Sequence, residues 1–113
     1  MITGGHVVIY SADADADRTF LRDVVALPSV DAGGGWLIFG LPAGEAAVHP
    51  AEEGGTQELY LMCSDVHATV AELSARGAEF SGEVSDEGWG LVTAIRLPGG
   101  GELHLYEPRH PTP

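Results

Sequence analysis

The sequence has no lysine and a single cysteine, Cys63. One cysteine excludes an intrachain disulfide and any zinc site built from paired cysteines. The sequence has 5 basic residues, all arginine, and 17 acidic residues, which gives a formal charge of −12 at pH 7. Because such a chain repels phosphate groups and anionic lipid, we expect no nucleic-acid partner and no membrane partner.

Long hydrophobic runs are also missing. No segment approaches the roughly 20 apolar residues of a membrane-spanning helix. The N-terminus lacks the basic segment followed by an apolar one that marks a secretory signal, so we expect a cytoplasmic protein. The 113 residues, 44% of them hydrophobic, predict one folded domain with its own core.

Two segments are predicted to be helical. Ala14–Ala26 has apolar residues at helical spacing and follows Asp13, a suitable N-cap. Val66–Arg76 has the same pattern after Asp65, and Gly77 suits the left-handed position that follows a helix.

Short strands separated by glycine and proline make up most of the remainder. They are predicted at His6–Ser11, Trp36–Leu41, Glu45–His49, Gln57–Cys63, Leu91–Leu97 and Gly101–Glu107, with weaker candidates at Ser29–Asp31 and Glu79–Val84. The order strand, helix, three strands thus occurs twice. We predict an α+β fold in which two βαβββ modules of one chain form a cupped mixed sheet with the helices on its outer face.

The two modules are predicted to form a single domain. Module 1 spans about residues 4–50 and module 2 about residues 57–108, with a linker at about 50–56 and a short proline-rich tail at 108–113. A module of roughly 50 residues cannot cover its own sheet face. The modules therefore pack on each other or pair across subunits, and we expect a homodimer.

Strand alternation places most of the chemistry-bearing side chains on one sheet face. Three imidazoles and one carboxylate gather there, from His6, His49, Glu58 and His104. Such nitrogen and oxygen ligands suit one divalent metal ion, Zn, Ni, Fe or Mn. Contacts to a small-molecule substrate are expected from Tyr10, Tyr60, Met62, Trp89, Arg96 and Tyr106, whereas His67 and His110 are expected to be surface residues.

The doubled βαβββ order, the spacing of His6 and Asp13, and the closing segment Leu97–Glu107 resemble the vicinal oxygen chelate superfamily. That superfamily includes glyoxalase I, bleomycin-resistance proteins and extradiol dioxygenases, and the resemblance extends from His6 to about Arg109. It implies one metal ligand on the opening and closing strand of each module, at His6, His49, Glu58 and His104. Glyoxalase I usually carries His or Gln, Glu, His and Glu at these places, whereas this chain carries His, His, Glu and His.

The resemblance implies a glyoxalase-like metal-dependent enzyme that chelates a small substrate through two neighbouring oxygens. Lyase or isomerase chemistry would then move a proton, with Glu58 or His104 as its catalytic carrier. An alternative from another class is a non-catalytic dimeric protein of the bleomycin-resistance kind. It would hold a drug or another small molecule, and acidic charge and tyrosines suit a cationic or flat ligand. A further alternative is an extradiol-type dioxygenase.

Overall fold

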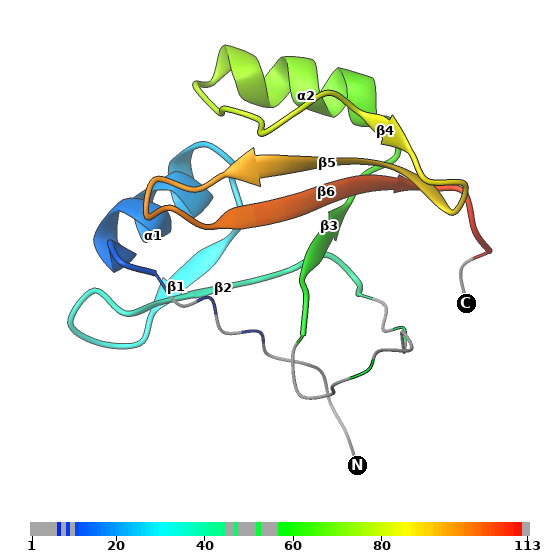
Figure 1. Ribbon diagram of the computed structural model, residues 1–113. Helices are drawn as coiled ribbons and strands as arrows, with labels where there is room; N and C mark the ends of the chain where they lie inside the picture. The colour runs from blue at the N-terminus through cyan, green and yellow to red at the C-terminus, as the bar shows by residue number, and fades with distance from the viewer. Residues whose placement is uncertain are drawn as a thin grey trace.

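The computed structural model describes residues 7, 9, 11–44, 47, 52 and 57–111. Its elements are, in chain order, α1 (Ala14–Asp23), β1 (Ser29–Asp31), β2 (Leu37–Phe39), β3 (Tyr60–Met62), α2 (Val66–Ala75), β4 (Ser85–Asp86), β5 (Gly90–Arg96) and β6 (Glu102–Pro108) (Figure 1). The series from β3 to β6 is one complete βαβββ unit, as predicted. The predicted strands at 6–11 and 45–49 fall largely outside the described residues.

The larger sheet is mixed and has four strands in the order β3-β6-β5-β4. β3 runs parallel to β6, and the other two neighbouring pairs are antiparallel. A parallel pair needs a long crossover connection, and α2 forms part of it here. A separate antiparallel pair, β1 and β2, aligns Val30 with Ile38. The α+β class and the mixed sheet are confirmed.

Both helices begin at the predicted aspartates and lie outside the sheet. The Asp13 side chain accepts the N–H of Ala16, and Asp65 accepts the N–H of Ala68. α2 covers one face of the four-stranded sheet (Figure 1). α1 lies at the hairpin end of β5 and β6, where the Gly99 N–H donates to the Asp17 carboxylate at 2.7 Å.

The first helix is shorter than predicted. It ends at Asp23 rather than at Ala26, because Ala26 has a left-handed φ of 62° and turns the chain away from the helix axis. Val25 and Leu27 still pack against the core from the following loop. The apolar pattern therefore continues beyond the end of the helix, which is why the predicted helix is longer than the observed one.

Several strands also differ from their predicted bounds. β2 and β3 have three residues each, and the segment Glu79–Val84 contributes only an isolated bridge between Phe80 and Ile95. Beside it, the Thr93 hydroxyl donates to the Gly82 carbonyl at 3.1 Å. The two-residue β4 follows this irregular stretch.

The core lies between the two helices and the inner sheet face. Its buried side chains are Phe20 and Leu21 from α1, Val66 and Leu73 from α2, and Leu61, Ile95, Leu103 and Leu105 from the sheet, together with Ala78 and Leu97. One continuous cluster thus joins residues from both halves of the sequence. In the part of the chain that the structure describes, no helix is long and apolar enough to cross a membrane.

Candidate ligand site on the open sheet face

The sheet face opposite α2 carries aromatic and polar side chains. In the register of β3 and β6, Tyr60 is aligned with His104 and Met62 with Tyr106. The intervening leucines of both strands are buried in the core. Alternation therefore brings these four residues to one face.

Five rings meet on this face and at its edge, and we call them the aromatic cluster: Tyr60, Trp89, His104, Tyr106 and His110. Tyr60, Trp89 and Tyr106 pack edge to face, with ring centroids 5.5–6.0 Å apart. His104 stacks on Tyr60 at 4.6 Å, and His110 stacks on Tyr106 at 5.9 Å. Trp89 stays 44% exposed, so the cluster offers ring surface to a ligand.

Tyr60 connects the two residues predicted to be catalytic. Its hydroxyl donates to Glu58 Oε2 at 3.1 Å, and its ring stacks on His104. Burial, and then the hydrogen bond to Glu58, raises the pKa of Tyr60 above its ordinary value. The hydroxyl therefore keeps its proton and remains a donor to the carboxylate.

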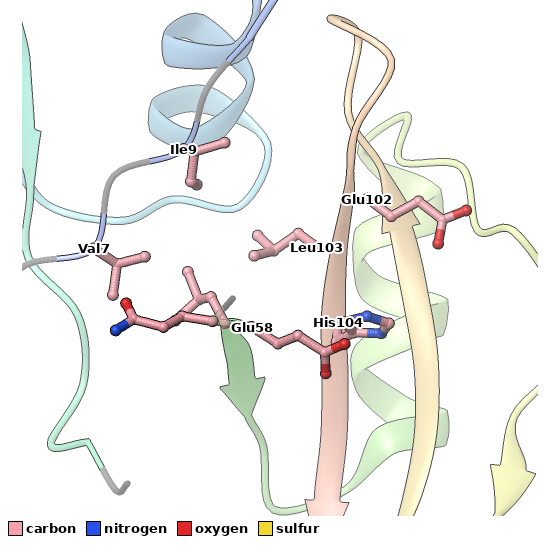
Figure 2. Close-up of a pocket in the computed structure, with 8 residues that line it drawn as sticks. Val7, Ile9, Glu58, Glu102, Leu103 and His104 are labelled. Atoms are coloured by element: carbon pink, nitrogen blue, oxygen red, sulfur yellow. The ribbon is translucent and has the colours of Figure 1, made fainter. Parts of the chain in front are cut away.

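Glu58 and His104 line a partly open cavity of ≈ 230 Å³, and Val7 and Ile9 line it from the N-terminal side. In Figure 2 the Glu58 side chain extends toward β6, where the His104 ring lies, and the Glu102 carboxylate points away from them. Pockets for drug-sized ligands measure roughly 300–1,000 Å³. This cavity suits a small group, and a larger ligand would extend over the aromatic cluster.

Two of the four predicted metal ligands, His6 and His49, lie outside the described residues, as does Tyr10. Among the residues that the structure does describe, no three His, Cys, Asp or Glu side chains come together. Glu58 and His104 direct one oxygen and one nitrogen donor to the same cavity. These donor types fit Zn, Ni, Fe or Mn.

The remaining predicted substrate contacts are only partly brought together. Met62 is half-buried beside Tyr106, on the face of the aromatic cluster. Arg96 is exposed at the last position of β5, aligned with Glu102, whereas Trp89 precedes the first position of that strand. At about 3.3 Å per residue, the two ends of β5 are roughly 20 Å apart. Arg96 therefore does not join the aromatic cluster.

Two residues of the site could not be identified from the sequence. His110, expected to be a surface residue, has its Nε2 3.2 Å from the Tyr106 hydroxyl, and the Arg109 N–H anchors its segment to the Trp89 carbonyl at 2.9 Å. The proline-rich tail has no periodicity that predicts these contacts. Gly90 is buried, and a Cβ there would lie 2.9 Å from Tyr106 Cδ2, so glycine leaves room for the ring.

Comparisons with known proteins agree on the fold. No family model matches the chain, and no curated protein matches it. Among solved structures, TnmS3, an antibiotic binding protein from Streptomyces sp. CB03234, has a TM-score of 0.63 at 23% identity, and the match covers 96% of this chain and 99% of the TnmS3 chain. A glyoxalase/bleomycin resistance protein/dioxygenase superfamily member from Sphaerobacter thermophilus has a TM-score of 0.67 at 18% identity, with 94% and 98% covered.

A third similar structure is a lactoylglutathione lyase from Agrobacterium tumefaciens, with a TM-score of 0.64, 17% identity, and 93% and 92% of the two chains covered. These proteins include an enzyme and a binding protein, so the likeness extends to the fold and not to one activity. The resemblance found in the sequence is confirmed at that level. The chain has the fold of the glyoxalase/bleomycin resistance protein/dioxygenase superfamily.

Proposed function

We propose that this protein binds a small, flat aromatic molecule on the aromatic cluster and does so without transforming it. The observation that carries the proposal is the packing of Tyr60, Trp89 and Tyr106, three rings edge to face with Trp89 still 44% exposed. A flat ligand that stacks on such a surface loses little side-chain entropy from the protein, because the rings are already held by one another.

The adjoining cavity favours a ligand with a polar substituent. A ring that lies on Tyr60 or Trp89 can direct a small group between Glu58 and His104, since Tyr60 touches both residues. The formal charge of −12 favours a neutral or cationic ligand over an anionic one. The similarity to TnmS3, described as an antibiotic binding protein, supports binding as a function that this fold performs at this length.

The test uses intrinsic fluorescence. The chain has two tryptophans, so a Trp36→Phe protein emits from Trp89 alone. A panel of neutral and cationic planar compounds is titrated against this protein, and binding is confirmed by calorimetry. We expect at least one compound to quench Trp89, and Trp89→Leu to weaken its binding by about tenfold or more, as truncation of an aromatic anchor does. Failure of the whole panel, or full affinity in Trp89→Leu, would refute the proposal.

A glyoxalase-like metal-dependent enzyme is the second candidate, favoured by the shared cavity of Glu58 and His104. Together with His6 and His49, they would hold one Zn, Ni, Fe or Mn ion. When bound, the ion would supply Lewis-acid polarisation of two neighbouring substrate oxygens. Glu58 or His104, where not bound to the ion, would carry the proton, and the Tyr60 hydroxyl would position the Glu58 carboxylate.

Metal analysis of the purified protein tests this second function. The metal-enzyme function predicts stoichiometric metal in the wild type and an affinity at least about tenfold lower in His104→Ala, because loss of a ligand costs no less than loss of a supporting partner. His67→Ala, a change on the exposed side of α2, is the matched control. Equal metal content in wild type, His104→Ala and His6→Ala would contradict the predicted ligand set.

A further inference from the structure

We infer that the ring of the bound ligand carries a positive charge, as the ring of a quaternised nitrogen heterocycle such as a quinolinium does. The inference rests on the binding function proposed above and names the ligand class. Two carboxylates beside the exposed ring of Trp89 carry the argument, Glu58 and Glu87. Both are exposed, and neither forms an ion pair with another residue that the structure describes.

Glu58 lies against the ring next to Trp89. Its Oε2 accepts the Tyr60 hydroxyl at 3.1 Å, and the Tyr60 ring packs edge to face with Trp89 at 6.0 Å. A neutral hydroxyl stabilises a carboxylate without cancelling its charge. The same carboxylate lines the cavity beside His104, so a ligand that covers these rings comes close to it.

Glu87 is held on the same sheet face by a serine. In the sheet register Ser85 is aligned with Val92, and Val92 with Tyr106, so Ser85 shares the face of the aromatic cluster. The Ser85 hydroxyl donates to Glu87 Oε1 at 2.7 Å, which draws this carboxylate toward that face. Glu87 is also two positions before Trp89 in the chain.

The pKa of Tyr60 responds to both negative charges. Burial raises this pKa most and the hydrogen bond to Glu58 comes next, while the charges of Glu58 and Glu87 raise it further. Two carboxylates from different segments thus act on one ring, and their potential favours a cation there. The faces of tyrosine and tryptophan rings attract cations as well, and tryptophan does so most strongly.

No arginine offsets these two charges, and the chain has no lysine. Arg109 is turned to the other sheet face, because it pairs at 3.1 Å with Glu107, which accepts the N–H of Val66 at the start of α2. Arg96 lies at the far end of β5. The other three arginines form ion pairs in or next to the helices: Arg18 with Asp15, Arg22 with Asp23, and Arg76 with Glu72. A cationic ligand would therefore bring the compensating charge.

The hydrogen-bond donors of the site serve a different part of the ligand. The Trp89 indole N–H and the His104 ring can donate to a neutral substituent, whereas the charged ring meets carboxylates and ring faces. At partly exposed sites, cation–π attraction and ion pairing each contribute a few-fold in affinity. We therefore expect a cation to be preferred by about tenfold over a neutral ring of the same shape.

The experiment compares N-methylquinolinium with 4-methylquinoline by calorimetry on the wild-type protein at pH 8. The two compounds have nearly the same flat shape, and only the first is charged. This pH is above the ordinary imidazole pKa of about 6.5, and salt at about 0.15 M screens the charge of distant acidic residues beyond about 8 Å. We expect the cation to bind at least about tenfold more tightly.

Two results would overturn the inference and leave the binding function standing. One is equal binding of the two compounds, or tighter binding of 4-methylquinoline. The other is that neither compound binds at millimolar concentration while another planar compound does. If no planar compound binds, the binding function fails together with the inference.

Two variants test the cause of the preference. Glu58→Gln and Glu87→Gln each remove one charge but keep an oxygen that accepts the Tyr60 or the Ser85 hydroxyl. In each variant the ratio of the two affinities should fall to a few-fold, and the affinity for 4-methylquinoline should stay unchanged. Glu79→Gln is the matched control, because it removes the same charge from an exposed residue whose carbonyl accepts the Arg96 N–H. A wild-type ratio in both test variants, or an equal fall in the control, contradicts the assignment.

Discussion

Replacing Gly90 with alanine tests whether the position of the Tyr106 ring depends on a missing side chain. An added Cβ would lie 2.9 Å from Tyr106 Cδ2 and 3.0 Å from the Glu107 carbonyl oxygen, whereas ordinary contact begins at 3.4 Å. The ring must therefore retreat by about 0.5 Å, the difference between 3.4 and 2.9 Å. It cannot do so freely, because His110 stacks on it and Trp89 packs against it.

The expected effect combines two opposing contributions. Overpacking of this kind costs about 1–3 kcal/mol, and replacing a strand glycine returns about 0.5–1 kcal/mol through the unfolded state, so the net loss lies between about 0 and 2.5 kcal/mol, with a midpoint of about 1 kcal/mol. Urea denaturation of wild type and variant measures it. Gly82→Ala is the control, because nothing lies within 4 Å of the added Cβ there. If Gly90→Ala is as stable as Gly82→Ala, the account of the ring's position is wrong.

Three further predictions concern the scaffold. Asp17→Ala leaves the Gly99 N–H without its 2.7 Å partner and should cost about 1–3 kcal/mol of unfolding free energy in urea, whereas Asp15→Ala, at a highly exposed site, should cost about 0.5 kcal/mol or less. Burial raises the pKa of the Cys63 thiol in the folded protein. The free energy of unfolding should therefore be unaffected by this thiol below about pH 8.5 and should fall as the pH rises above that value, and the fall should be less steep in Cys63→Ala. Finally, light scattering should give twice the chain mass of 11.8 kDa, and a monomer would contradict the expected homodimer.

The parts of the fold that local chemistry determines were predictable from the sequence. α2 was predicted to within a residue, because Asp65 and Gly77 mark its two ends by hydrogen bonding and by a left-handed φ of 102°. The assignment of Leu61 to the core and Tyr60 to the open face followed from strand alternation alone. Side chains alternate between the two faces of a strand, so each residue is assigned to one face without ambiguity once one face is known to be buried.

The aromatic cluster as a whole could not be predicted. Its rings come from four segments: Tyr60 from β3, Trp89 from the turn before β5, His104 and Tyr106 from β6, and His110 from the tail. Each contact joins residues whose proximity depends on strand register and turn geometry, which periodicity does not encode. Arg96 illustrates the converse error, because sharing a face with His104 does not bring it near Trp89.

The two candidate functions share Tyr60, yet they use different surroundings and are therefore separable. Trp89 contacts Tyr60 and Tyr106 in the cluster, and it does not line the cavity of Glu58 and His104. Trp89→Leu removes stacking surface but no metal donor, and His104→Ala removes a donor while the edge-to-face rings remain. A binding protein thus loses its ligand mainly in the first variant, and a metal enzyme loses its ion only in the second. Measuring ligand affinity and metal content in both variants therefore decides between the two functions.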